Sequence, residues 1–347
     1  MQAVQQRGPG GPEVLYLDQT DLPELRPGEM MIRVEASAVN RADTLQRRGL
    51  YPPPPGTSHV LGLECAGRVV KVAEGSEGDW REGEEVMALL GGGGYAQYAA
   101  VQPGHVMRVP RGLDMTEAAA IPEVWLTAYQ LLHLTAELRP GQTVLVHAGG
   151  SGVATAAVQL VRLAGARSFV TAGTDSKVAT ALSLGAAAGA NYRTDVWREE
   201  VSKWSGGRGV DVILDCIGSS YFSDNLHSLA QDGRWVIYGL MGGPDLSGPL
   251  LAGLLKKRAR LLFTTLRART DQYKTDLVSQ FTKNCLHHFE VDVVLKSFII
   301  IFVLQGPEPT LRPIVDCSFS VLDVVKAHRK MEENANNGKI VLRLDVS

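Results

Sequence analysis

The stretch VLVHAGGSGVATAAVQL, residues 144–160, constrains the fold of this chain more than any other. A run of β-branched and other apolar residues ends in glycines, and apolar residues then recur at helical spacing, at Val153, Ala157, Leu160 and Ala164. A buried strand, a tight glycine turn and a helix in this order are typical of a βα unit whose helix N-terminus attracts phosphate.

The glycine turn matches a dinucleotide fingerprint. Gly149, Ser151 and Ala154 occupy the positions of G-x-G-x-x-G/A, with Gly152 between them. Small residues there let the backbone approach a pyrophosphate and let the helix pack closely on the strand. The Ser151 hydroxyl is expected to point toward phosphate or nicotinamide, with the alternative that serine is only the smallest residue tolerated. We predict dinucleotide binding, against a purely structural turn.

Patterns along the chain predict two kinds of architecture. After about residue 121, strands alternate with helical segments, and the predicted buried parallel strands are 144–148, 168–172, 210–215 and 235–239. This alternation predicts an α/β fold with a doubly wound parallel sheet of the Rossmann type. Earlier residues contain short alternating runs such as 30–39 and 66–73, which predict a mostly β, barrel-like unit. Gly91 to Gly94 are interpreted as a turn without a chemical role.

The segment TAGTDSK, residues 171–177, bears on the choice of cofactor. An acidic residue about 20 positions after the glycine turn would bind the ribose 2′-OH of NAD. Residues 171–174 contain none, and Lys177 lies one helical turn further on, so NADPH is predicted. A solvated helix residue is the alternative for Lys177. Asp175 argues weakly for NAD, but it is interpreted as the N-cap of the following helix.

Composition bounds the partners and the compartment. A formal net charge of -2 provides no basic surface, so nucleic acid is not expected to bind. The four cysteines lie far apart and form no Cys-x-x-Cys motif, which favours reduced thiols in the cytoplasm. The first residues resemble neither a signal peptide nor a transit peptide, and no membrane anchor is expected.

Further stretches carry a family resemblance: NRADTLQRRGLYPPPPG (40–56), VLGLECAG (60–67), AAAIPEVWLTAYQLL (118–132), LDCIGSSY (214–221), DGRWVIYGLMGG (232–243) and NGKIVLRL (337–344). With the glycine turn, they resemble the quinone oxidoreductase branch of the medium-chain dehydrogenase/reductase superfamily. The resemblance implies a GroES-like catalytic domain formed by residues 1–121 and 266–347, with a Rossmann NADPH-binding domain at 122–265. It also implies a homodimer joined through edge strands of the nucleotide domains.

The same resemblance implies site residues. Tyr51, Ser151 and Asn40 would lie at the catalytic centre, and Tyr51 is the candidate for a hydrogen bond to a quinone oxygen. The alternative for Tyr51 is a ring that only packs against Pro52 to Pro55. The implied cofactor contacts are Thr127 near the carboxamide, Lys177 and Tyr192 at the 2′-phosphate, Ile217 and Gly218 on the adenosine side, Gly239, Leu240 and Leu266 on the nicotinamide side, and Gly149, Ser151, Gly152, Val153 and Gly173 along the glycine turns.

Zinc is not expected. Zinc-dependent alcohol dehydrogenases of this superfamily use a cysteine and a Gly-His-Glu segment as ligands, whereas this chain has NRAD and Gly62-Leu63-Glu64. Leucine cannot ligate zinc, and no four-cysteine lobe is present for a structural ion. His59 is interpreted as incidental.

These observations predict hydride transfer from NADPH to a quinone, which needs little activation because its product is aromatic. One alternative is an alkenal or enone reductase, which additionally needs a proton donor at the α-carbon. Another is a non-catalytic NADPH-binding protein, such as one that binds RNA, as is attributed to relatives in this branch.

Residues 291–305, VDVVLKSFIIIFVLQ, depart from the family pattern. The apolar core at 298–304 is too short for a membrane span, which needs about 20 residues. It would have to be buried as an extra strand or would promote aggregation. Our hypothesis is an insertion from splicing or gene modelling, since the pattern resumes with a helix at 324–331.

Overall fold

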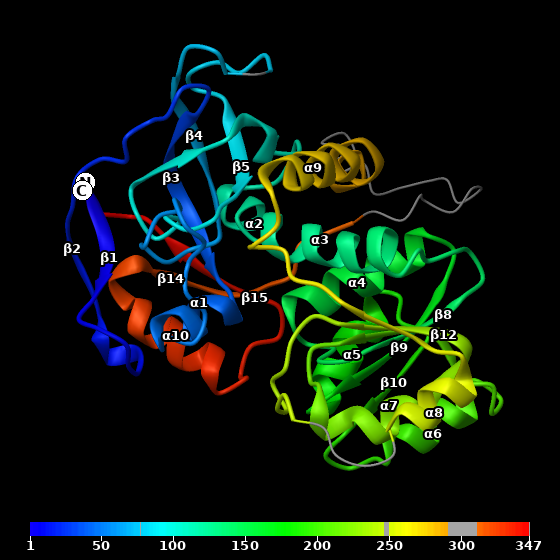
Figure 1. Cartoon of the computed structure of the whole chain (residues 1–347). Helices are drawn as coiled ribbons and strands as arrows, with labels where there is room; N and C mark the ends of the chain where they lie inside the picture. The colour runs from blue at the N-terminus through cyan, green and yellow to red at the C-terminus, as the bar shows by residue number, and fades with distance from the viewer. Residues whose placement is uncertain (77, 246–249, 291–310, 347) are drawn as a thin grey trace, which may run out of the picture. The chain divides into compact units, whose positions relative to one another are not determined.

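The computed structural model describes residues 1–76, 78–245, 250–290 and 311–346. The chain folds into two compact units (Figure 1). Residues Met1–Leu126 and Leu266–Ser347 form the first, called the β unit below, and Thr127–Thr265 form the second, called the α/β unit. The α/β unit is thus inserted into the sequence of the β unit.

The described part of the α/β unit is built on a six-stranded parallel sheet in the order β10-β9-β8-β11-β12-β13. Its strands are β8 (Thr143–Val146), β9 (Arg167–Ala172), β10 (Ala188–Asn191), β11 (Val210–Asp215), β12 (Leu229–Ile237) and β13 (Arg260–Phe263). Its helices are α4 (Gly152–Leu163), α5 (Asp175–Ser183), α6 (Trp197–Trp204), α7 (Phe222–Ser228) and α8 (Leu250–Lys257). Val144, Leu145 and Val146 in central strand β8 are all fully buried. The predicted Rossmann-type doubly wound sheet is confirmed.

Strand boundaries follow the sequence pattern with few differences. β11 covers the predicted 210–215, whereas β12 begins at Leu229, six residues before the predicted 235. The first part of β12 includes the polar residues QDGR, which give no apolar signal in the sequence. Its pairing with β11 is irregular at this point, between Val210 and Val212 of β11.

The predicted N-cap of α5 was wrong by one residue. Thr174, not Asp175, caps the helix, because Thr174 Oγ1 accepts a hydrogen bond from the Lys177 backbone N–H at 3.3 Å. Asp175 is the first helical residue, and its Oδ1 accepts a hydrogen bond from Asn191 Nδ2 at 2.8 Å. Asp175 is therefore tied to the end of β10, where an acid in the first helical turn is also favoured by the helix dipole.

The described part of the β unit contains a seven-stranded, mostly antiparallel sheet, in the order β14-β15-β3-β4-β5-β7 with β6 paired to β3. Its strands are β3 (Met30–Val39), β4 (Glu64–Val72), β5 (Glu85–Leu89), β6 (Tyr98–Val101), β7 (Val106–Arg108), β14 (Val315–Ser320) and β15 (Lys339–Arg343), and β1 (Gln2–Gln6) pairs separately with β2 (Leu15–Gln19). Helices are α1 (Arg41–Arg47), α2 (Met115–Ala118), α9 (Asp271–Cys285) and α10 (Val324–Glu332), and α3 (Pro122–Tyr129) begins in this unit.

The core of the β unit follows the period of its strands. Met30, Ile32 and Val34 of β3 alternate inward and pack with Ile340 and Leu342 of β15. The antiparallel pairing of Ile340 with Val39 and of Leu342 with Ser37 places the last strand of the chain beside one of the first. The C-terminal segment is thereby part of the N-terminal fold, and the GroES-like, mostly β architecture is confirmed.

Residues 291–305, the predicted insertion, lie outside the described residues. The helix predicted after them at 324–331 is α10, which ends one residue later, at Glu332. No helix of the described residues has both the length and the apolar character needed to cross a membrane.

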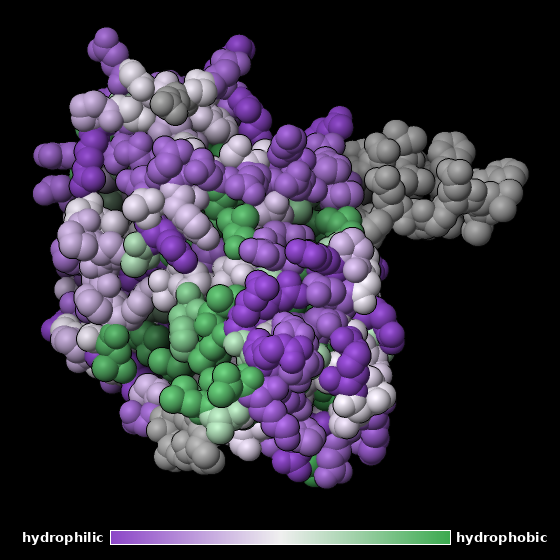
Figure 2. Space-filling view, turned by 45° about the vertical axis from the view of Figure 1, so that its right-hand side comes forward, coloured by the Kyte–Doolittle hydropathy of each residue, from purple (hydrophilic) through white to green (hydrophobic). Residues whose placement is uncertain are grey.

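The surface carries some hydrophobic side chains. The face displayed in Figure 2 is mainly hydrophilic, and most of its hydrophobic side chains gather in one area. Among the large exposed hydrophobic residues of the α/β unit are Leu182, Leu240, Leu251, Leu255 and Phe263.

Candidate cofactor site and buried polar network

The glycine turn after β8 opens directly onto α4. Ser151 is the N-cap, and its Oγ accepts a hydrogen bond from the Ala154 backbone N–H at 3.2 Å. This cap uses an oxygen lone pair, so the hydroxyl proton can still be donated to a ligand. Ala148 has a φ of 56°, an uncommon left-handed conformation for a residue with a Cβ. A Cβ at Gly149 would lie 3.2 Å from Val170 Cβ, which is a tight contact, so the turn favours a small residue there.

The turn after β9 lies beside the end of β10. A Cβ at Gly173 would lie 2.6 Å from the Tyr192 hydroxyl, so a larger residue there would displace the end of this tyrosine side chain. Tyr192 is 42% exposed, and Lys177 stands in the first turn of α5. Tyr192 thus adjoins the turn from which the helix of Lys177 starts, as the implied contact with a 2′-phosphate would require.

The turn after β11 is shaped by a buried carboxylate. Asp215 is fully buried, and its Oδ1 accepts hydrogen bonds from the backbone N–H groups of Ile217 at 2.6 Å and Gly218 at 3.0 Å. Its Oδ2 accepts from Asn225 Nδ2 and Trp235 Nε1, each at 3.0 Å. Gly218 has a φ of 84°, and a Cβ there would lie 2.8 Å from a backbone oxygen, so glycine is required.

These turns lie at one edge of the sheet, because parallel strands end on the same side. The turn residues that the sequence singled out follow β8, β9, β10, β11 and β12: Gly149, Ser151, Gly152, Val153, Gly173, Lys177, Tyr192, Ile217, Gly218, Gly239 and Leu240. The strand order reverses at β8, whose neighbours are β9 and β11. Dinucleotides bind at such a switch point, and the α4 N-terminus and glycine turns fit a pyrophosphate.

Two implied cofactor contacts stand at the borders of the α/β unit. Thr127 is its first residue and is partly buried. Leu266, which is 6% exposed, is the first residue of the chain's return to the β unit. Leu266 therefore does not belong to the glycine turns of the parallel sheet.

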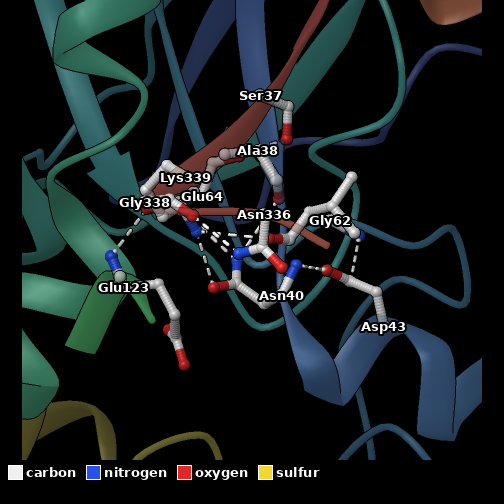
Figure 3. A network of polar contacts seen from close by, with 12 residues as sticks. Ser37, Ala38, Asn40, Asp43, Gly62, Glu64, Glu123, Asn336, Gly338 and Lys339 are labelled. Carbon is white, nitrogen blue, oxygen red and sulfur yellow. Dashed lines mark hydrogen bonds and ion pairs between the residues drawn. The ribbon is translucent and has the colours of Figure 1, made fainter. Parts of the chain in front are cut away.

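A buried polar network occupies the β unit (Figure 3). Glu64, at the start of β4, and Lys339, at the start of β15, form an ion pair with 2.7 Å between Oε1 and Nζ. The two side chains are almost completely buried. Asn40 bridges them, since its Nδ2 donates to Glu64 Oε1 and its Oδ1 accepts from Lys339 Nζ, both at 2.7 Å. Both functional groups of Asn40, predicted beside the substrate, are thus used within the network.

Asp43 extends this network along α1. Its Oδ2 accepts from the Asn40 backbone N–H at 2.8 Å, and its Oδ1 accepts from the Gly62 N–H at 2.9 Å. The Tyr95 hydroxyl donates to Oδ2 at 3.3 Å. Complete burial raises the pKa of Asp43 to about 6, because these bonds offset only part of the desolvation cost.

Glu123 is joined to the network through its backbone only. The Glu123 N–H donates to Glu64 Oε2 at 2.8 Å, while its side chain turns away from the Glu64–Lys339 pair (Figure 3). Burial, followed by repulsion from the Glu64 carboxylate, raises the pKa of Glu123 to about 8. At neutral pH, Glu123 is therefore mainly a protonated acid that can release a proton.

Tyr51 lies against an arginine. The Arg267 guanidinium carbon is 5.6 Å from the centroid of the Tyr51 ring. Arg267 is held by Gly91 O, which accepts from Nε at 2.9 Å and from Nη2 at 2.7 Å, and by Gln46 Oε1, which accepts from Nη2 at 2.7 Å. The sequence pattern at Gly91 to Gly94 is interpreted as a turn without a chemical role. In the structure, the Gly91 carbonyl oxygen accepts the hydrogen bonds that hold Arg267 in place.

Sequence reasoning missed most of this network. Glu123, in AAAIPEVWL, gave the clearest signal, because an acid within an apolar segment is unusual. Lys339 and Arg267 carry no local signal: Lys339 lies 275 residues from Glu64, and Arg267 lies 221 residues from Gln46.

The part of the chain that the structure describes contains no cluster of three or more His, Cys, Asp or Glu side chains that could hold a metal ion. Leu63 is 1% exposed within the β unit, and His59 is exposed.

Comparison with known families agrees with both units. Residues 152–283 match the zinc-binding dehydrogenase family, and residues 26–111 match the alcohol dehydrogenase GroES-like domain. The chain is 30% identical to a quinone oxidoreductase from Lama guanicoe, covering 99% of this chain and 98% of the relative. It therefore belongs to the medium-chain dehydrogenase/reductase superfamily. Within that superfamily, its full-length relatives include quinone oxidoreductases.

One solved structure and one further sequence relative are also similar to this chain. The crystal structure of Escherichia coli quinone oxidoreductase complexed with NADPH has a TM-score of 0.81 and 27% identity, covering 99% of this chain and all of that one. A synaptic vesicle membrane protein VAT-1 homolog from Danio rerio is 30% identical over 92% of this chain. The chain spans 65% of that relative's length. The likeness thus supports an oxidoreductase that binds NAD(P)H.

Proposed function

We propose that this protein reduces quinones by hydride transfer from NADPH without a metal ion. The observation that carries the proposal is the gathering of glycine turns at the switch point beside β8. Lys177 lies in the first turn of α5, and Tyr192, after β10, lies against the Gly173 turn. Bound NADPH would supply the hydride. A quinone that takes up this hydride and one proton becomes an aromatic hydroquinone, and NADP⁺ is left.

The residues of the chain bind and orient. The N-terminus of α4, with Ser151, would hold the pyrophosphate, and Asp215 keeps the Ile217–Gly218 turn in shape. Tyr51 would donate a hydrogen bond to a quinone oxygen. Burial raises the pKa of Tyr51, so the phenol stays protonated and can donate a hydrogen bond without losing its proton.

The experiment that tests this function uses purified full-length protein treated with a chelator. NADPH and an ortho- or para-quinone are added, and loss of NADPH absorbance is followed. We expect turnover that persists after chelation. A protein that binds NADPH but oxidises it with no quinone of either kind would contradict the proposal.

NADPH preference is expected to depend on Lys177. Lys177→Ala should raise the Kd for NADPH about tenfold and leave the Kd for NADH nearly unchanged, since a charge-assisted bond to the 2′-phosphate is lost. Titration by cofactor fluorescence measures both constants. Lys203→Ala, an exposed lysine on α6, is the control and should change neither. Equal weakening of both cofactors by Lys177→Ala would show that Lys177 does not read the 2′-phosphate.

Glu123 favours a second candidate function, reduction of enones. Hydride addition to the β-carbon of an enone must be followed by protonation of the α-carbon, and a protonated Glu123 is an acid suited to this step. Comparing kcat/KM for matched quinones and enones separates the two functions. Higher kcat/KM for enones, lost in Glu123→Gln, would favour the enone reductase.

We also propose a homodimer joined through β13. This strand is one of the two edge strands of the described parallel sheet, the other being β10, and Phe263 on it is 66% exposed. Leu251 and Leu255 of α8 are 82% and 79% exposed. An apolar sheet edge of this kind pairs readily with a second copy.

The dimer is expected to dissociate when this edge is charged. Phe263→Glu should give mainly monomer in light scattering coupled to size-exclusion chromatography, because a carboxylate would be desolvated at the interface. Leu182→Glu, at a position on α5 that is 44% exposed, should leave the dimer intact. A Phe263→Glu protein that remains dimeric would place the interface elsewhere.

The proposed compartment is the cytoplasm. Cys65, Cys216 and Cys285 are buried, and all four cysteines are free thiols. Free thiols persist in a reducing compartment such as the cytoplasm. Imaging of the tagged full-length chain in intact cells, together with fractionation of those cells, tests this location.

A further inference from the structure

Arg267 has an unused hydrogen-bond donor. The side chain is 4% exposed, and Nε and Nη2 donate to Gly91 O and Gln46 Oε1. Its Nη1 is also buried but has no hydrogen-bond partner among the residues that the structure describes. Buried donors are nearly always paired, so this nitrogen calls for an acceptor that the described chain does not provide.

The charge of Arg267 also lacks a close counter-ion among the described residues. Both of its acceptors are neutral oxygens, and none of the described residues forms a salt bridge with it. The acids that act on its charge are Asp43 and Glu123, and Lys274 opposes it. At neutral pH Glu123 is mainly protonated, whereas Asp43, with a pKa of about 6, is mainly ionised but forms no salt bridge with Arg267 among the described residues. An anionic oxygen at hydrogen-bond distance from Arg267 would therefore still be favoured.

Tyr51 brings a second donor to the same place. Its ring lies against the guanidinium group and is only partly buried, whereas Arg267 is fixed at two acceptors. A ligand can reach the buried Nη1 only if a neighbouring group, such as this partly buried ring, moves aside. Two donors of this kind, one of them charged, are the arrangement that stabilises a developing oxyanion.

We propose that Arg267 Nη1 is, beside the Tyr51 hydroxyl, a second hydrogen-bond donor to the substrate oxygen on which negative charge develops. This inference rests on the proposed quinone reduction. When the quinone accepts a hydride with its electron pair, the cofactor is oxidised to NADP⁺ and the quinone becomes a hydroquinone monoanion. Arg267 binds the anionic oxygen, and one proton from solvent or from Glu123 completes the hydroquinone.

The test measures binding, so that it does not depend on turnover. The probes are 2-hydroxy-1,4-naphthoquinone, an anion at neutral pH, and neutral 1,4-naphthoquinone. Each is titrated into full-length protein, with and without NADP⁺, and tryptophan fluorescence is followed. In Arg267→Met we expect the Kd of the anion to rise at least tenfold and that of the neutral quinone less than threefold.

Two variants make this result specific. Arg267→Lys keeps a charge without the fork of donors and should recover only part of the affinity for the anion. Arg269→Met, at an exposed position two residues along, should change neither Kd. If Arg267→Met unfolds, Arg267→Lys carries the comparison, and an unchanged ratio of the two Kd values in that variant overturns the inference.

The outcomes separate this inference from the proposed function. Equal loss of both probes in Arg267→Met would mean a structural role and would overturn the inference, even with quinone turnover intact. Selective loss of the anion in a protein that reduces no quinone would support the site for an anionic oxygen, while the proposed function failed.

Discussion

Replacing Lys339 with methionine is expected to lower the free energy of unfolding of the β unit by about 3–5 kcal/mol. Glu64 is fully buried, and its ion pair with Lys339 is 2.7 Å long. Methionine has a similar length but no charge, so the variant leaves the carboxylate buried without its cation. Hydrogen exchange in increasing urea, read on peptides from β3, β4 and β15, reports the stability of this unit.

Two comparisons make the result interpretable. Lys326→Met removes an exposed lysine of α10 in the same unit and should change stability by no more than about 0.5 kcal/mol. The double variant Lys339→Met with Glu64→Gln should regain much of the loss, because no buried charge remains. If the double variant lost the sum of both single effects, the pair would contribute through packing and not through charge compensation.

The parts of the fold that sequence predicted well are those that depend on neighbouring residues. The strand at 210–215 and the helix starting at Val324 follow from hydrophobic period, and the glycine turn follows from steric limits within one βα unit. β10, with the sequence AGAN, was not foreseen because it has no β-branched residue. Its place in the sheet comes from pairing with β9.

The polar network was out of reach for a different reason. Asn40 was singled out, but its partners Glu64 and Lys339 are 24 and 299 residues away. Burial and pairing of such groups are decided only when the antiparallel pairing of β15 with β3 brings the chain ends together. Motifs therefore identified the glycine turns of the proposed cofactor site, whereas the acid–base groups became visible only in three dimensions.

Stability of the β unit is expected to fall as the pH rises from 6.5 to 8.5, through the titration of Glu123. Its folded pKa is about 8, against 4.5 for the free group. Within this range the unfolded chain has released the proton that the folded chain still holds, so raising the pH favours unfolding. The loss should be about 1–2 kcal/mol.

Glu123→Gln should remove this part of the pH dependence, because the amide does not titrate. Hydrogen exchange on peptides of the β unit, compared at pH 6.5 and 8.5 after correction for the intrinsic exchange rate, gives the change. Glu82→Gln, at an exposed position of the same unit, should keep the wild-type pH dependence. Titration of His105 and His328, whose pKa values are lowered by burial, raises stability up to about pH 7.5, because the unfolded imidazoles still release protons near pH 6.5. This rise is the same in wild type and in Glu123→Gln, so the comparison of the two proteins removes it. A fall of the same size in wild type and Glu123→Gln would therefore show that Glu123 is already ionised at neutral pH. In that case Glu123 could not be the proton donor that the enone alternative requires.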